Sequence, residues 1–88
     1  MKADHEKVSQ ALKTARGQID GILRMVNDDR YCVDISNQLL AVEALLKKTN
    51  KVVLEAHLQS CVRDSFTSGT DVDQKIDEIL RLLDKLVR

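Results

Sequence analysis

The chain is 88 residues long, which leaves room for a single domain spanning residues 1–88. It carries 14 acidic and 14 basic residues, so a formal net charge of zero gives it no overall attraction to nucleic acid or lipid. Proline is absent and the only aromatic residues are Tyr31 and Phe66, so the core must be aliphatic and helix is favoured throughout.

The first predicted helix is marked by apolar residues that recur every three or four positions on one face. These residues are Val8, Leu12, Ala15, Ile19, Ile22 and Val26. The cluster Asn27-Asp28-Asp29 ends the pattern, because such residues favour turns and caps over helix interiors.

The second predicted helix runs from about Tyr31 to Phe66 without a glycine or proline. Its apolar residues spread over more than one face, which predicts a central helix that is contacted from two sides. Residues 67–70 (TSGT) are predicted to break this helix.

The third predicted helix follows that break, with Asp71 and Gln74 as part of its N-terminal cap. Its aliphatic residues recur at heptad-like steps: Val72, Ile76, Ile79, Leu83 and Leu86. The expected fold class is therefore all-α, with the order helix, long helix, shorter helix. Three helices around a two-sided middle one cannot bury all this apolar surface alone, which predicts a homodimer or a larger assembly.

The chain shows no sign of membrane insertion or export. No apolar run approaches the roughly 20 residues that a membrane span requires, and the first residues lack a signal-peptide hydrophobic region. We therefore expect a cytoplasmic protein whose two cysteines, Cys32 and Cys61, stay reduced.

His57 and Cys61 are the first candidate metal ligands, because residues four apart on a helix share one face. Cys32 precedes His57 by 25 residues, which is roughly 37 Å along a continuous helix, so it cannot reach His57 within one chain. In an antiparallel dimer whose long helices cross near Leu45 and Leu46, Cys32 of one chain would meet the His57/Cys61 pair of the other. Symmetry would then create two equal sites that exist only in the dimer.

Two thiolates and one imidazole form a soft set of three ligands, which suits Cu(I). Zn(II) would require a fourth ligand, for which a mobile His5 is one candidate, and Mg(II) or Ca(II) would fit poorly. A structural alternative stays open at this point, because a lone buried cysteine is usually a packing residue. A lone histidine is likewise usually a surface or capping residue.

Several separate segments match one protein family in order and spacing. They are Arg16-Gly17-Gln18, Gly21-Ile22, residues 29–35 (DRYCVDI), Gln38, Ala41-Val42, His57-Leu58 and Cys61-Val62. Through them the chain resembles the copper-sensing operon repressor (CsoR) family over essentially its whole length, and Cys32, His57 and Cys61 match the spacing of that family's Cu(I) ligands. The resemblance implies a homotetramer made of two antiparallel dimers, without a helix-turn-helix. It also implies that the apo form binds operator DNA and that Cu(I) releases it, so that copper-efflux genes are expressed.

The resemblance also implies roles for residues around the ligands. Tyr31 and Glu78 would form hydrogen bonds around the ligand His57 and tie the second helix to the third. Basic residues would meet the operator phosphates: Lys13, Arg16, Lys47, Lys48 and Lys51. Two arginines of the family pattern are absent, with Ala11 and Lys51 in their places. A copper chaperone is a further expected partner.

Other sensors in the family differ from this chain in their ligands. Nickel or cobalt sensors replace the last cysteine with histidine, and formaldehyde sensors lack a cysteine at position 61. Persulfide and redox sensors keep two cysteines but lack the middle histidine, so His57 disfavours that alternative. A copper-buffering helical bundle that never binds DNA is an alternative of another class. No enzyme is expected, because no nucleophile–base–acid set, phosphate loop or open catalytic metal site is recognisable.

Overall fold

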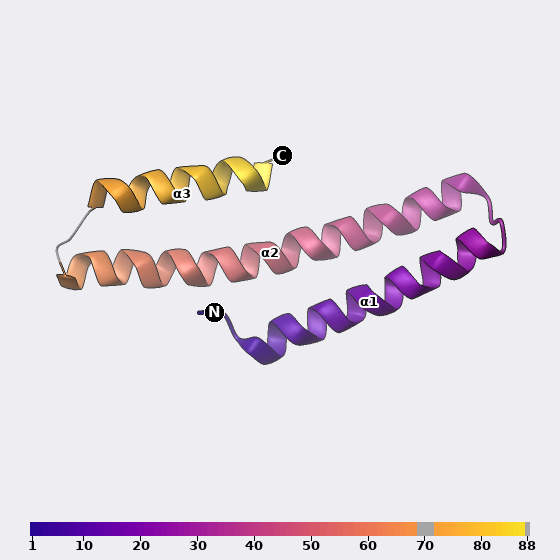
Figure 1. The fold of residues 1–88 in the computed structure, drawn as a ribbon, viewed down its shortest axis with the longest axis horizontal. Helices are drawn as coiled ribbons and strands as arrows, with labels where there is room; N and C mark the ends of the chain where they lie inside the picture. Colours follow the sequence, from indigo (N-terminus) through magenta and orange to yellow (C-terminus); the bar gives the residue numbers. More distant parts are fainter. Residues whose placement is uncertain (69–71, 88) are drawn as a thin grey trace.

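The computed structural model describes residues 1–68 and 72–87, which form three helices: α1 (His5–Asn27), α2 (Cys32–Ser68) and α3 (Val72–Val87). Figure 1 shows α1 running back along the first half of α2, and α3 running back along its second half on the opposite side. Within the described residues, α1 and α3 each contact α2 and do not contact one another. The prediction of an all-α chain with a central helix contacted from two sides is confirmed.

The turn between α1 and α2 contains one residue with a left-handed backbone conformation. Asp29 has a φ of 52°, and its amide donates to the carbonyl of Val26 at 3.1 Å. The amide of Arg30 donates to the carbonyl of Met25 at 2.9 Å. These two bonds form a Schellman motif, which satisfies the last carbonyls of α1 and reverses the chain toward Cys32. The predicted end of the first helix at the Asn27-Asp28-Asp29 cluster is confirmed.

The end of α2 differs from the prediction. The helix continues through Ser68, whereas the sequence predicted a break over residues 67–70. The prediction is therefore wrong for residues 67 and 68. Serine and threonine do not end a helix by themselves, because a hydroxyl can bond to the carbonyl one turn earlier. Thr49 does this inside α2, where its Oγ1 donates to the carbonyl of Leu45 at 2.8 Å. Asp71, the predicted cap of the third helix, lies outside the described residues.

The contact between α1 and α2 is a seam of small and medium-sized side chains. On α1 the buried residues are Val8, Ala15 and Ile22, each seven positions after the last. On α2 the buried residues Val42 and Thr49 are also seven positions apart. A seven-residue repeat keeps one stripe of each helix facing its neighbour, so the two helices pack along their shared length.

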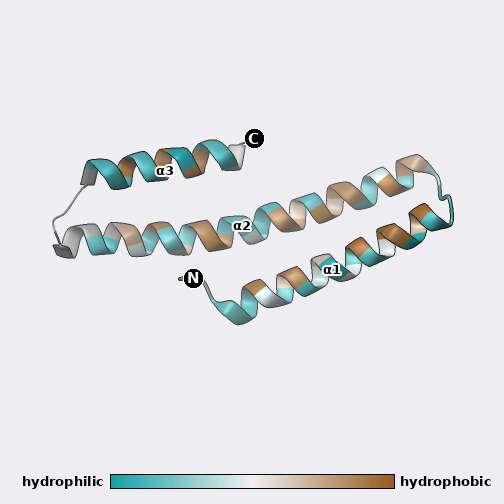
Figure 2. Cartoon of the chain, viewed as in Figure 1, coloured by the Kyte–Doolittle hydropathy of each residue, from teal (hydrophilic) through white to brown (hydrophobic). Residues whose placement is uncertain are grey.

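The protomer leaves much of its apolar surface uncovered. Its dimensions are 58 × 26 × 12 Å and its radius of gyration is 17.6 Å, whereas a compact domain of this length would have about 12 Å. Hydrophobic residues line all three helices in Figure 2. Many large apolar side chains are exposed, among them Leu12, Ile19, Leu23, Val26, Leu39, Leu40, Leu46, Ile76, Leu80 and Leu83. Such a thin layer of helices, with its apolar side chains exposed, favours association with another protein surface.

An apolar groove of about 670 Å³ lies between α1 and α2. Ile19 and Leu23 of α1 form one wall, and Leu39 and Leu46 of α2 form the other.

Among residues 1–68 and 72–87, no helix combines the length and hydrophobicity that crossing a bilayer requires.

Candidate metal centre

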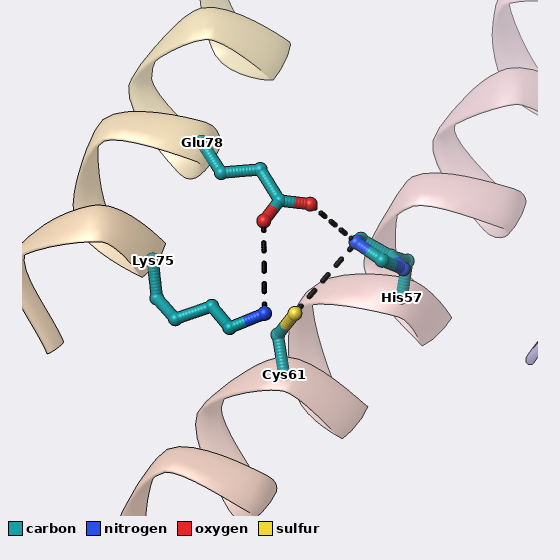
Figure 3. Close-up of polar contacts among 4 residues, drawn as sticks. All are labelled: His57, Cys61, Lys75 and Glu78. Carbon is teal, nitrogen blue, oxygen red and sulfur yellow. Dashed lines mark hydrogen bonds and ion pairs between the residues drawn. The ribbon is translucent and has the colours of Figure 1, made fainter. Parts of the chain in front are cut away.

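The histidine and cysteine of the predicted ligand pair meet on one face of α2. The Nε2 atom of His57 lies 3.7 Å from the Sγ atom of Cys61, one helical turn further along. Cys61 is buried, with 8% of its surface exposed, whereas the side chain of His57 is 43% exposed. The thiol is therefore sheltered between the helices while the imidazole lies at the edge of the same site (Figure 3).

Glu78 of α3 completes this cluster from the other side. Its Oε1 atom accepts a hydrogen bond from Nε2 of His57 at 2.7 Å, which links α3 to α2. Its other oxygen, Oε2, lies 3.9 Å from Nζ of Lys75, one turn earlier on α3 (Figure 3). The bond from His57 is the largest cause that lowers the pKa of the Glu78 carboxyl; the nearby charge of Lys75 acts in the same direction, and partial burial opposes both. Glu78 is therefore a carboxylate at neutral pH.

Among the described residues, His57, Cys61 and Glu78 are the ones that could hold a metal ion together within one protomer. One donor atom from each lies within 4.8 Å of the other two. The set offers one imidazole nitrogen, one sulfur and one carboxylate oxygen, which are the donor types that transition metals take from proteins.

Cys32 and Tyr31 lie at the far end of α2. Cys32 is the first residue of that helix and is exposed, and Tyr31 precedes it with 66% of its surface exposed. The helix between Cys32 and His57 is continuous, so roughly 37 Å separates them. One protomer thus brings His57, Cys61 and Glu78 together and leaves Cys32 and Tyr31 apart from them, and neither cysteine forms a disulfide.

The basic residues expected to contact DNA are exposed on two helices. Lys13 and Arg16 lie on α1, and Lys47, Lys48 and Lys51 lie on α2. Two of them make ion pairs along α2: Lys47 with Glu43 at 3.3 Å, and Lys51 with Glu55 at 3.8 Å. Lys48 lines a small depression of about 210 Å³ between the two helices, together with Lys7, which the predicted set omitted.

Sequence reasoning missed one residue beside the candidate metal ligands. Lys75 was not singled out, although it lies three positions before Glu78 and such pairs face each other on a helix. That spacing alone could have identified it as a partner of the carboxylate.

Comparison with known proteins identifies the family to which this chain is similar. The family described as metal-sensitive transcriptional repressors matches residues 4–85. The copper-sensing transcriptional repressor CsoR of Bacillus subtilis is 40% identical over 85 residues, which cover 97% of this chain and 83% of that protein. CsoR of Mycobacterium ulcerans is 44% identical over 71 residues, covering 77% of this chain but only 61% of the length of that protein.

A solved structure agrees with the sequence matches. The copper-sensing repressor CsoR with Cu(I) from Geobacillus thermodenitrificans superimposes with a TM-score of 0.82 at 31% identity, over 94% of this chain and 85% of that one. Because the family match spans nearly all of the chain and a solved relative shares its fold, this protein belongs to the metal-sensitive transcriptional repressor family.

Proposed function

We propose that this protein is a Cu(I)-sensing transcriptional repressor of the cytoplasm. Its apo form would bind operator DNA, and Cu(I) binding would weaken that complex and allow copper-efflux genes to be expressed. Two matched relatives and a solved relative named for copper sensing support the assignment. The ligand chemistry of this chain supports it independently.

The proposed copper ligands are His57, Cys61 and Cys32 of the partner subunit. The uninterrupted α2 supports this division, because it keeps Cys32 far from the pair within each protomer. Two antiparallel copies of α2 that cross near Leu45 and Leu46 would bring the two ends together. Leu46 lines the exposed apolar groove, which offers a surface for such a partner. Two such dimers would associate into a tetramer.

The donor set fits the ion. Two cysteine sulfurs and one imidazole nitrogen are soft ligands, and Cu(I) prefers thiolates and accepts three-coordination. Cys61 is already sheltered from solvent, which favours a stable site for a soft cation. When bound, the ion would supply a link between two protomers through their thiolates.

The observation that carries the proposed mechanism is the 2.7 Å hydrogen bond between His57 and Glu78. It joins a proposed ligand on α2 to α3, so a change in the position or electronic state of the imidazole is transmitted to the third helix. Tyr31 of the partner subunit would join this hydrogen-bonding group, since it directly precedes Cys32. Such a shift would favour a conformer in which the basic residues no longer match the phosphates.

The proposed DNA contacts are Lys13, Arg16, Lys47, Lys48 and Lys51. A coupling of about 1–3 kcal/mol between the two ligands would weaken DNA binding roughly 5- to 150-fold when copper binds. Because phosphate contacts dominate such interfaces, the affinity should also fall steeply with salt. A copper chaperone is the proposed donor of the ion.

The test is DNA-binding anisotropy with a duplex selected by the apo protein from genomic fragments, at fixed salt, with and without Cu(I) under reducing conditions. Copper should release the wild-type protein. The His57→Ala variant should bind DNA in the apo form, retain copper through its thiolates and respond weakly. Unchanged DNA affinity of the wild type in Cu(I) would refute the proposal, and absence of any DNA binding would instead indicate a copper buffer.

A further inference from the structure

We propose that His57, Cys61 and Glu78 also form a binding site for a divalent cation of the Zn(II) type that lies within one protomer and does not use Cys32. The inference rests on the proposed function in one respect, because it gives the copper-ligand pair a second occupant. A single protomer already brings three donor atoms from α2 and α3 within 4.8 Å of one another.

The separation between His57 and Cys61 matches tetrahedral coordination, whereas the separation between His57 and Glu78 is shorter than such coordination requires. With Zn–N about 2.0 Å and Zn–S about 2.3 Å, a tetrahedral ion holds its nitrogen and sulfur ligands roughly 3.5 Å apart. The corresponding separation between His57 and Cys61 is 3.7 Å. The nitrogen and oxygen ligands of such an ion lie roughly 3.4 Å apart. The hydrogen bond from His57 to Glu78 is 2.7 Å long, so the carboxylate must move back by about 0.7 Å, and its flexible side chain is 41% exposed.

The donor types select a different ion from the proposed copper set. One nitrogen, one sulfur and one oxygen are the ligands that Zn(II) takes, whereas Cu(I) favours a second thiolate over a carboxylate. Three protein ligands leave a fourth position for water, and the exposed sides of His57 and Glu78 give solvent access to it. This differs from a closed structural zinc site, which has four protein ligands.

The protons balance in this reaction. The short contact between Nε2 of His57 and the Glu78 carboxylate is a hydrogen bond when the neutral ring carries its proton on Nε2. An ion bound at Nε2 takes the place of that proton, and the proton of the neutral ring then resides on Nδ1. Cys61 loses its thiol proton to solvent, and Glu78 is already a carboxylate, so one proton is released for each ion bound.

Occupancy of this site has a regulatory consequence. It uses both His57 and Cys61, so a bound divalent ion excludes Cu(I) from the same pair. It also replaces the hydrogen bond between His57 and Glu78 with a metal bridge between α2 and α3. Zinc in excess would therefore raise the concentration of Cu(I) needed to release DNA.

The experiment titrates the reduced 88-residue protein with Co(II), a spectroscopic probe for Zn(II) sites, and then displaces Co(II) with Zn(II). We expect one ion per protomer and a thiolate-to-Co(II) charge-transfer band. The Cys32→Ser variant should keep the band with an affinity within about twofold of the wild type. Glu78→Gln should weaken binding at least about tenfold. The matched control is Glu55→Gln, which removes an exposed glutamate that is paired with Lys51, and it should change nothing.

Two further measurements separate the outcomes. Glu78→His supplies a donor atom again and should restore the Co(II) affinity, which distinguishes coordination from a general loss of α3 packing. Disappearance of the band in Cys32→Ser, or wild-type affinity in Glu78→Gln, would overturn the proposal. Copper-dependent DNA release, measured in parallel, tests the proposed function separately: it should be lost in Cys32→Ser, while Co(II) binding persists.

Discussion

Replacing Asp29 with glycine should stabilise the protein without changing its response to metal. Asp29 is held at a φ of 52° by the motif that ends α1. That conformation costs an L-residue about 1–2 kcal/mol, and less for aspartate, whose short side chain tolerates it. Glycine avoids this cost, but it loses more conformational entropy on folding, which lowers the stability by about 0.5–1 kcal/mol. We expect a net gain of up to about 1 kcal/mol, which corresponds to a rise in Tm of up to about 8 °C for a domain of this size.

The assay is denaturant unfolding followed by circular dichroism, at one protein concentration, because association also contributes to stability. The matched control is Asp28→Gly, one position earlier, where φ is −86° and ψ is 4°. Glycine has no advantage there and should destabilise by about 0.5–1 kcal/mol. If Asp29→Gly unfolds no later than the wild type, or both variants shift the midpoint in the same direction, the reasoning from backbone strain is wrong.

Two further predictions concern the partner surface and the cluster. Leu46 lines the apolar groove and is 41% exposed, so Leu46→Lys places a charge on this surface. The substitution should weaken self-association at least tenfold, as measured by analytical ultracentrifugation. Unchanged association would show that the groove is not an interface. Glu78 has a folded pKa below its ordinary value of 4.5, so it stabilises the fold above the unfolded pKa and loses this effect as the pH falls through the folded pKa. The difference in unfolding free energy between the wild type and Glu78→Gln should therefore be present at pH 6 and shrink below about pH 4; a difference that stayed constant to pH 3 would contradict this.

The helices and the ligand pair could be predicted because they depend on local spacing. Apolar steps of three and four residues identified α1, and the four-residue step from His57 to Cys61 placed both side chains on one face. The length of α2 followed from the absence of glycine and proline and showed that Cys32 must lie far from His57. These inferences required helix geometry and no long-range contact.

The remaining features depend on how separate elements meet. Position 78 was identified only through family resemblance, since nothing local shows that a glutamate on α3 reaches an imidazole on α2. The neighbouring Lys75 was missed for a different reason, because its three-residue spacing from Glu78 is local but was not considered. The left-handed backbone of Asp29 was likewise hidden, because aspartate also suits ordinary turns and caps. The extension of α2 to Ser68 shows that weak helix formers can continue a helix that the preceding residues have already formed.

The rigid separation of Cys32 from His57 along α2 has a consequence for how such a sensor behaves in a cell. If the two thiols of a copper site come from two copies, the response depends on the concentration of the protein as well as on that of the ion. With the proposed intersubunit ligands, each copy would lack a complete copper site at concentrations below the dissociation constant of the dimer, and it would not respond however much copper is present. The threshold for derepression would then depend on the rate at which the protein is made, so a repressor that also controlled its own gene would adjust its sensitivity with every round of expression.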